Sequence, residues 1–115
     1  MKLYGIPNCD TVKKARAWLG AHHMIYDFHD FKKLGVSGTW LQEVVAQTGW
    51  QALLNQRGTT WRQLDETTKS AVIDLTSAIA LMVHQPSLIK RPVLEAEGRY
   101  HLGFSGSQYQ AIFGE

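Results

Sequence analysis

Residues 2–12 read KLYGIPNCDTV and contain the signals that decide the fold. Lys2–Ile6 is a short apolar run that stops at a proline and an asparagine, which predicts a buried strand ending in a turn. Cys9 follows this turn directly. A turn after the first strand of an open α/β fold is a common ligand-binding position, so the segment makes Cys9 the first candidate for chemistry.

The residues after the cysteine predict a helix and a second strand. Asp10 or Thr11 is suited to cap the helix, and apolar residues then recur at helical spacing until Gly20. Aromatic and β-branched residues predict a strand over Met24–Phe28, followed by a polar loop over Asp30–Gly38. A β-α-β unit of this length favours parallel strands.

The rest of the chain predicts a helical block and then a β-β-α ending. Apolar residues recur at helical spacing within Ser37–His84. Val93–Glu95 and Tyr100–Leu102 flank a Glu-Gly turn and predict a hairpin. Ser105 begins a final helix, in which Gln108 completes the pattern of a capping box.

This order of elements predicts an α/β protein of thioredoxin-like fold. We expect a mixed central sheet flanked by helices, with a helical insert between the β-α-β and β-β-α halves. A right-handed crossover would place the hairpin beside the first strand. Residues 1–115 are expected to form a single domain, with the insert at about 37–84.

Composition excludes several classes of protein. At 44% hydrophobic and 19% charged residues, the chain has the composition of a globular protein. Its net charge of +2 arises from interspersed charges, so no nucleic-acid partner is expected. The N-terminus lacks the apolar core of a signal peptide and no stretch has membrane-spanning length, which predicts a cytoplasmic protein without a membrane partner.

Cys9 is the candidate catalytic residue. The unpaired N–H groups and the dipole of a helix N-terminus favour a thiolate, which is the nucleophilic form of cysteine. The alternative is a buried, inert cysteine, the commoner fate of a single cysteine. One cysteine cannot form an internal disulfide, so any redox chemistry of Cys9 requires an outside partner.

Candidate binding residues carry positive charge. Arg91 stands before Pro92, and a cis bond there would turn backbone groups outward while Arg91 stabilises a thiolate or an oxyanion. Arg57 lies in a polar junction, and Lys13 lies in the first helix near the cysteine; solvated surface positions are the alternative for all three cations. The five histidines show no metal-ligand spacing and no phosphate loop or dinucleotide fingerprint is present, so neither a metal nor a nucleotide is expected.

Two segments resemble the hallmarks of a known family. YGIPNCDTVKKA at residues 4–15 and IKRPV at 89–93 are similar to those of the ArsC/Spx (arsenate reductase-like) family, and the resemblance spans essentially the whole chain. NCDT at 8–11 and NQRGTT at 55–60 look most similar to the YffB branch, a group of glutathione-dependent thiol reductases.

The resemblance implies a thioredoxin-like fold and specific roles. Cys9 would be the reactive thiol, Arg91 the anion-binding arginine before a cis Pro92, and Arg57 a basic pocket residue. Arsenate reductases carry a further arginine after the hairpin and one where Asn55 falls, which argues against arsenate reduction. Spx regulators typically carry a Cys-x-x-Cys switch, which this chain lacks.

We therefore expect a monothiol, glutathione-dependent thiol-disulfide reductase. Cys9 would attack a disulfide through a mixed-disulfide intermediate, with Arg91, Arg57 and Lys13 supporting the anion. Glutathione, bound beside Asn8 and Pro92, would be the co-substrate, with a glutaredoxin as a further candidate partner. The alternatives are arsenate reduction and a non-enzymatic, Spx-like protein that binds RNA polymerase.

Overall fold

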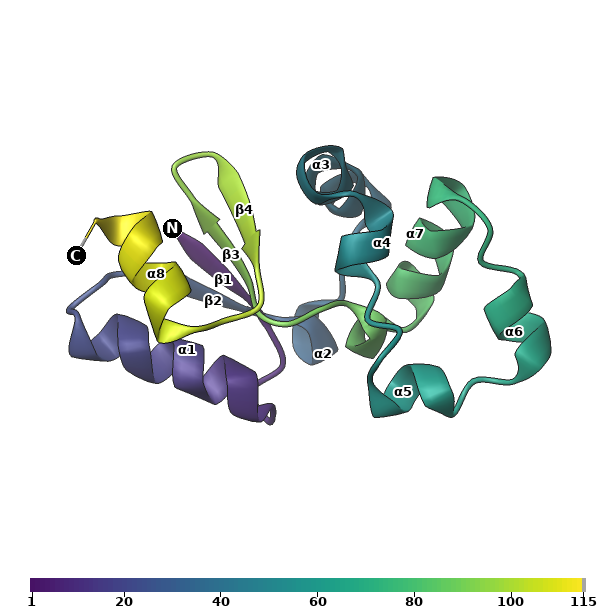
Figure 1. Cartoon of the computed structure of the whole chain (residues 1–115), viewed down its shortest axis with the longest axis horizontal. Helices are drawn as coiled ribbons and strands as arrows, with labels where there is room; N and C mark the ends of the chain where they lie inside the picture. Colours follow the sequence, from purple (N-terminus) through teal and green to yellow (C-terminus); the bar gives the residue numbers. More distant parts are fainter. Residues whose placement is uncertain (115) are drawn as a thin grey trace. The chain divides into compact units, whose positions relative to one another are not determined.

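The computed structural model describes residues 1–114 and divides into two compact units (Figure 1). The sheet unit contains residues 1–30 and the described chain from Arg91 onward. The helical unit contains Phe31–Lys90. The helical unit thus begins earlier and ends later in the sequence than the expected insert of about 37–84. The expected single-domain organisation stays a prediction.

The sheet unit is a four-stranded mixed sheet with two long helices. Its strand order is β2-β1-β3-β4; β1 and β2 are parallel, and the other neighbours are antiparallel. The β-α-β and β-β-α halves, and the hairpin beside the first strand, are therefore confirmed. The elements are β1 (Lys2–Gly5), α1 (Asp10–Ala21), β2 (Asp27–Asp30), β3 (Val93–Ala96), β4 (Arg99–Leu102) and α8 (Gly106–Phe113).

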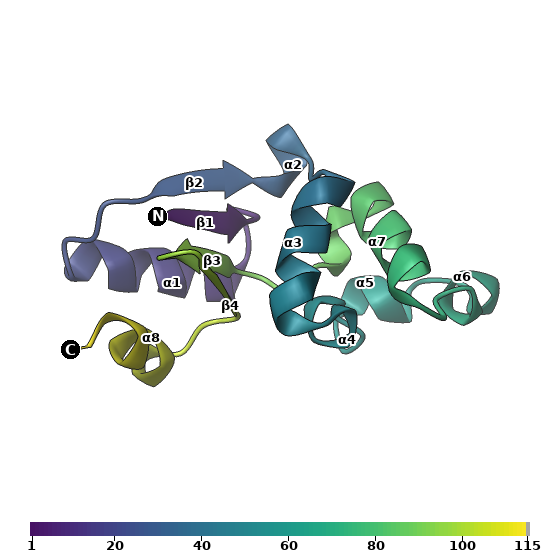
Figure 2. The same ribbon diagram turned by 90° about the horizontal axis from the view of Figure 1, so that it is seen from above.

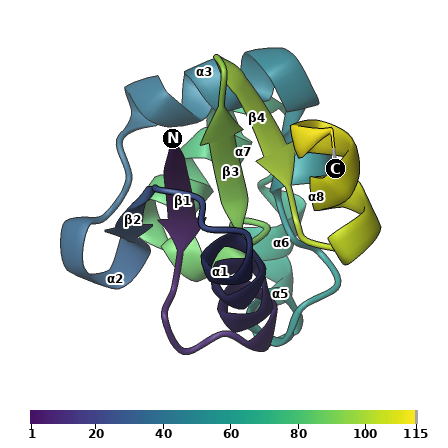
Figure 3. The same ribbon diagram turned by 90° about the vertical axis from the view of Figure 1, so that its left-hand side faces the viewer.

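Both helices of this unit pack on one face of the sheet (Figure 3). Leu3 of β1 and Leu94 of β3 are directly paired, and both are fully buried on that face. Leu19 of α1 and Tyr109 of α8 cover them and are also fully buried. Burial of one such apolar side chain stabilises the fold by about 1.5–3 kcal/mol, so this cluster fixes α1 against β1.

The hairpin turn has the geometry that its sequence predicts. Glu97 and Gly98, which lie between the paired residues Ala96 and Arg99, have φ angles of 53° and 76°. Positive φ at both central residues is the signature of a type I′ turn, whose twist matches that of the flanking strands. The expected turn is confirmed.

The helical unit is built around the packing of α3 on α7 and α4, and Figure 2 shows α3 and α7 side by side. Val44 of α3 and Met82 of α7 are fully buried there. Helices α3 and α7 each have a side-chain cap: Ser37 accepts from Trp40 N at 3.0 Å, and Asp74 forms a capping box with Ser77. The elements are α2 (Phe31–Leu34), α3 (Gly38–Thr48), α4 (Trp50–Leu53), α5 (Thr59–Arg62), α6 (Glu66–Ser70), α7 (Leu75–His84) and the 3₁₀ helix η1 (Pro86–Leu88).

The second strand forms as expected, but its bounds and the loop after it were predicted wrongly. The strand is Asp27–Asp30 rather than Met24–Phe28. Helix α1 extends to Ala21, and a turn with His23 at φ 56° then lets Met24 N donate to Leu19 O at 2.9 Å. Met24, the residue expected to start the strand, is therefore bonded to the end of α1 instead.

The expected polar loop over residues 30–38 contains helix α2. The sequence pattern missed this helix because it is only four residues long. Phe31 is 1% exposed and makes an edge-to-face contact with Trp40, at 5.9 Å between ring centroids. Burial of this aromatic ring anchors the short helix in the helical unit.

The two helix starts of the sheet unit also differ from expectation. Cys9 itself is the N-cap of α1, so neither Asp10 nor Thr11 caps that helix. Ser105 caps α8 by accepting from Gln108 N at 3.0 Å, but the side chain of Gln108 donates to Leu102 O at 3.1 Å. The capping box is therefore half formed, because Gln108 ties the helix to the preceding strand instead.

Candidate active site at Cys9

Cys9 lies between the end of β1 and the first turn of α1. Its backbone is extended, with φ −136° and ψ 126°, and its carbonyl accepts the first helical hydrogen bond, from Lys13 N at 2.9 Å. The side chain is partly buried. Cys9 is thus at the N-cap position, where the free N–H groups of a helix point toward its sulfur.

The close packing of Gly5 and Val12 fixes the position of the cysteine loop. A Cβ atom built on Gly5 would lie 2.9 Å from Cγ2 of Val12, which is too close for any other residue without a shift. Val12 is fully buried, so it has little room to move. Glycine at the end of β1 therefore allows the first turn of α1 to approach the strand.

The surroundings of Cys9 lower the pKa of its thiol below the ordinary value. Burial has the largest single influence and raises the pKa, but the remaining influences together outweigh it. They are the backbone N–H of Val12, the hydrogen bond and positive charge of the Arg91 guanidinium, and the backbone N–H of Thr11. The sulfur does not form a strict capping hydrogen bond, yet these N–H groups favour the thiolate.

The register of the sheet explains how Arg91 reaches Cys9. Tyr4 of β1 pairs with Val93 of β3, and the two strands are antiparallel. The residues before β3 therefore lie at the end of β1 from which the chain continues to the cysteine. Sequence positions far apart thus form one site within the sheet unit.

The peptide bond between Arg91 and Pro92 is cis, as the resemblance implied. Pro92 is buried, and its carbonyl accepts a hydrogen bond from Gly103 N at 2.8 Å. Gly103 has φ 75°, a conformation that favours glycine, so the chain after β4 is held against the start of β3. This contact fixes the backbone beside Arg91.

The other expected site residues lie in different surroundings. Asn8 is exposed at the turn before Cys9, and Lys13 is exposed on α1. Arg57 belongs to the helical unit, where it lines a pocket with Lys90. The structure therefore brings Arg91 to Cys9, while the roles of the other three residues stay predictions.

Helix N–H groups were expected to favour a Cys9 thiolate, but the residues that supply them were not identified from the sequence, and the contact of Gly103 was missed. The N–H groups of Thr11 and Val12 act on the sulfur because Cys9 is the N-cap, and the side chains of those two residues give no sign of this role. Placing the helix start one residue earlier would have found them. Gly103 was also missed, since nothing in its sequence neighbourhood links it to Pro92.

Residues 1–114 contain neither a cluster of metal-ligating side chains nor a membrane-spanning helix. No group of three or more histidine, cysteine, aspartate or glutamate residues in this range could hold a metal ion. Within the same range, no helix has the length and apolar character needed to span a bilayer.

The mixed sheet, with Cys9 at the start of α1 and a cis proline before β3, defines a thioredoxin-like α/β protein. A match to the ArsC family extends over residues 4–112. The chain belongs to the ArsC family.

Three known proteins are similar to this chain over most of their length. A protein named YFFB, of solved structure, is 53% identical, with 96% of each chain covered and a TM-score of 0.90. An arsenate reductase (ArsC) related protein from Brucella melitensis is 47% identical, with 99% of this chain and 94% of that chain covered and a TM-score of 0.77. The global transcriptional regulator Spx of Streptococcus mutans is 26% identical, with 96% of this chain and 80% of that protein covered.

Proposed function

We propose that the protein is a glutathione-dependent thiol-disulfide reductase in which Cys9 is the nucleophile. The observation that carries this proposal is the lowered pKa of the Cys9 thiol, caused by Val12 N–H, Arg91 and Thr11 N–H against the opposing influence of burial. Thiolates attack disulfides and thiols do not, so a lowered pKa increases the reactive fraction near neutral pH. A cysteine with a purely structural role does not require N–H groups and an arginine that lower the pKa of its thiol.

In the first step, the Cys9 thiolate attacks the glutathione sulfur of a mixed disulfide between glutathione and a substrate thiol. A bond forms between the Cys9 sulfur and the glutathione sulfur, and the substrate's sulfur–sulfur bond breaks. The substrate leaves as a thiolate and takes a proton from water. Cys9 is then in a mixed disulfide with glutathione.

In the second step, a second glutathione completes the cycle because the chain has no other cysteine. Its thiolate attacks the glutathione sulfur bound to Cys9, which releases oxidised glutathione and regenerates the Cys9 thiolate. The net reaction converts one mixed disulfide and one reduced glutathione into one free thiol and oxidised glutathione. A glutaredoxin thiol is an alternative resolving partner.

Glutathione recognition is assigned to groups around the cysteine. The exposed Asn8 and the backbone beside Pro92 offer hydrogen-bonding groups to an extended peptide, and Lys13 offers an exposed ammonium to a carboxylate. Arg91 stabilises the thiolate before attack and each departing thiolate afterwards. The cytoplasm, where thiols are kept reduced, is the compartment that suits this cycle.

Two alternative functions are arsenate reduction and non-enzymatic regulation. Arsenate reduction has support from the relative named as an arsenate reductase related protein, and it would also use Cys9 as nucleophile. A non-enzymatic regulator has support from the similarity to Spx. Neither alternative explains the site better, because the first needs additional anion-binding arginines and the second needs no activated thiolate.

The test is a turnover assay with a glutathionylated peptide, reduced glutathione and glutathione reductase, monitored through NADPH oxidation. We expect saturable activity for the wild type and none for Cys9→Ser. A parallel assay replaces the peptide with arsenate. Turnover with arsenate alone would favour the alternative enzyme, and no Cys9-dependent turnover with either substrate would contradict the proposal.

A further inference from the structure

A second candidate site lies entirely within the helical unit. It is a pocket of about 350 Å³ whose lining includes two cationic side chains, Arg57 and Lys90. Amide side chains of Gln51, Asn55 and Gln56 add hydrogen-bonding groups, and the remaining lining residues are apolar. The volume is sufficient for a small organic molecule.

The backbone of the pocket is held by two paired segments. Leu54 and Ile89 form an antiparallel bridge, Asn55 N donates to Leu88 O at 2.7 Å, and Lys90 N donates to Leu53 O at 2.8 Å. This pairing positions Lys90 against the segment that leads to Arg57. The two cations therefore lie on a fixed backbone although they are distant in sequence.

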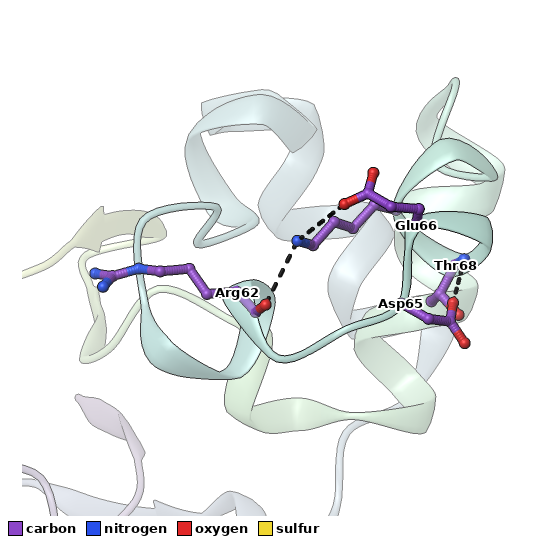
Figure 4. A network of polar contacts seen from close by, with 5 residues as sticks. Arg62, Asp65, Glu66 and Thr68 are labelled. Atoms are coloured by element: carbon purple, nitrogen blue, oxygen red, sulfur yellow. Dashed lines mark hydrogen bonds and ion pairs between the residues drawn. The ribbon is translucent and has the colours of Figure 1, made fainter.

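Hydrogen bonds to the backbone N–H and the backbone carbonyl of Arg57 also hold the loop that carries this residue. Arg57 N donates to Oδ1 of Asn55 at 3.1 Å, and the Arg57 carbonyl accepts from Nη2 of Arg62 at 2.7 Å. The carbonyl of Arg62 in turn accepts from Nζ of Lys69 at 3.5 Å, which links the loop to α6 (Figure 4). A preorganised loop loses little conformational entropy on binding a ligand.

Gly58 allows this loop to close on Asn55. A Cβ atom at position 58 would lie 2.7 Å from Nδ2 of Asn55. The Asn55 side chain cannot turn away freely, because its oxygen accepts the hydrogen bond from Arg57 N. The loop thus has a compact conformation in which the N–H and carbonyl groups of Arg57 are both hydrogen-bonded. The guanidinium of Arg57 remains available to bind a ligand.

The charge of the pocket is not balanced by the protein. No acidic residue lines it, and neither Arg57 nor Lys90 forms an ion pair with a carboxylate anywhere in residues 1–114. An arginine fork binds carboxylate or phosphate groups through two parallel hydrogen bonds, and a lysine adds a point charge. An anion bound here would relieve the repulsion between the two cations.

We propose that this pocket binds a small organic polyanion, with one acidic group on Arg57, a second on Lys90, and the amide side chains of Gln51 and Gln56 as further donors. The shared chemistry of the ligand is two or more carboxylate or phosphate groups. The proposal rests on residues of the helical unit alone and does not depend on the reaction proposed above.

The test is an amide-shift NMR titration of the full-length Cys9→Ser protein at low salt, with citrate and with inorganic pyrophosphate as separate probes. We expect saturable shifts at the backbone amides of residues 51–57 and at Lys90, with a dissociation constant of about 1 mM or lower for at least one probe. Saturation by citrate alone assigns the pocket to carboxylates, and saturation by pyrophosphate alone assigns it to phosphates. The absence of saturation with both probes would overturn the proposal.

Charge-matched variants separate this pocket from general electrostatic attraction. Arg57→Gln and Lys90→Gln should each weaken binding about fivefold or more, whereas Lys14→Gln, which removes an exposed charge on α1, should leave it unchanged. Both pocket side chains are exposed, so both variants should fold, as the dispersion of the same spectra will report. Equal weakening by Lys14→Gln would also overturn the proposal.

Discussion

The Arg91 guanidinium hydrogen-bonds to Cys9, so the residue before β3 acts on the N-terminus of α1. The cis bond to Pro92 and the contact of Pro92 O with Gly103 N, at 2.8 Å, hold the backbone from which this side chain extends. The thiol environment therefore depends on the strand register of the sheet as well as on the helix start.

Replacing Arg91 should raise the pKa of Cys9. Arg91→Gln removes the guanidinium charge and its hydrogen bond, while the N–H groups of Val12 and Thr11 remain. We expect the rate of iodoacetamide alkylation at pH 6–7 to fall by roughly threefold or more, because a tenfold loss of thiolate accompanies each unit of pKa. Mass spectrometry of samples quenched at successive times measures this rate.

Two further variants control this experiment. Arg91→Lys retains the charge without the planar fork and should give an intermediate rate. Lys14→Gln removes an exposed charge from α1 and should alkylate like the wild type. If Arg91→Gln also alkylates at the wild-type rate, Arg91 has no part in activating the thiol.

Adding a methyl group at Gly5 should destabilise the fold. In Gly5→Ala, the new Cβ would lie 2.9 Å from Cγ2 of the buried Val12, and relief of that contact requires α1 to move from the strand. We expect a loss of about 1–3 kcal/mol in the free energy of unfolding, measured by urea denaturation. Alkylation of Cys9 should slow in parallel, because Val12 N–H moves with the helix.

A double-mutant cycle identifies the contact responsible. Val12→Ala removes the methyl groups that Gly5→Ala would meet, so the double variant should be more stable than the sum of the single effects predicts. If the two single variants' changes in the free energy of unfolding simply add in the double variant, the contact with Val12 is not the reason that position 5 requires glycine.

Removing the hydroxyl of Tyr109 should not destabilise the protein. Tyr109 is fully buried, its oxygen has no hydrogen-bond partner within residues 1–114, and burial raises the pKa of its phenol. Tyr109→Phe retains the edge-to-face contact with Phe104, at 4.7 Å between centroids, and discards an unsatisfied polar group. We expect the free energy of unfolding to be unchanged or to rise by about 1 kcal/mol.

The matched control for Tyr109 removes the ring. Tyr109→Ala should cost about 3–5 kcal/mol, because it leaves a cavity in the core of the sheet unit. A loss of stability in Tyr109→Phe comparable to that in Tyr109→Ala would mean that the hydroxyl is satisfied in solution.

The cap of α7 should give the stability a pH dependence. The backbone N–H of Ser77, and then its hydroxyl, hydrogen-bond to Asp74 and lower the pKa of that carboxyl in the folded state. A lowered folded pKa means that the stabilisation is present above the ordinary aspartate pKa of about 4 and is lost as the pH falls through the folded value.

Thermal unfolding of wild type and Asp74→Ala measures this effect. The variant should melt at a lower temperature at pH 7, and the difference should shrink steadily below about pH 4. A difference in melting temperature that is the same at both pH values would show that the carboxylate form is not what stabilises the helix. Asp65→Ala, which removes the cap of α6, provides a second example.

The sheet unit was predictable because its signals are local. Short apolar runs, the Glu97–Gly98 turn and the capping Ser105 each act within a few residues, and the order of the elements they predict indicates the topology. The start of β2 was missed because the turn through His23 depends on a hydrogen bond back to Leu19. Propensity patterns do not encode such contacts.

The candidate site was predictable only in its two main residues. Cys9 and Arg91 have recognisable sequence neighbours, a turn and a proline, and the resemblance to the family linked them. Arg57 was expected to be a basic pocket residue, but its combination with Lys90 was not foreseen. That combination depends on pairing between Leu54 and Ile89, which are separated by the helices of the same unit. The helical pattern indicated α3 and α7 but gave no information about that pairing.

The measurement that tests the central claim most directly is the rate at which oxidised glutathione modifies Cys9 as a function of pH, followed by intact-protein mass spectrometry beside Cys9→Ser. We predict one Cys9-dependent glutathione adduct, with a rate that falls off at a lower pH than that of an ordinary thiol, whose pKa is about 8.5. Slow modification that appears only at alkaline pH would show an ordinary thiol and contradict the account.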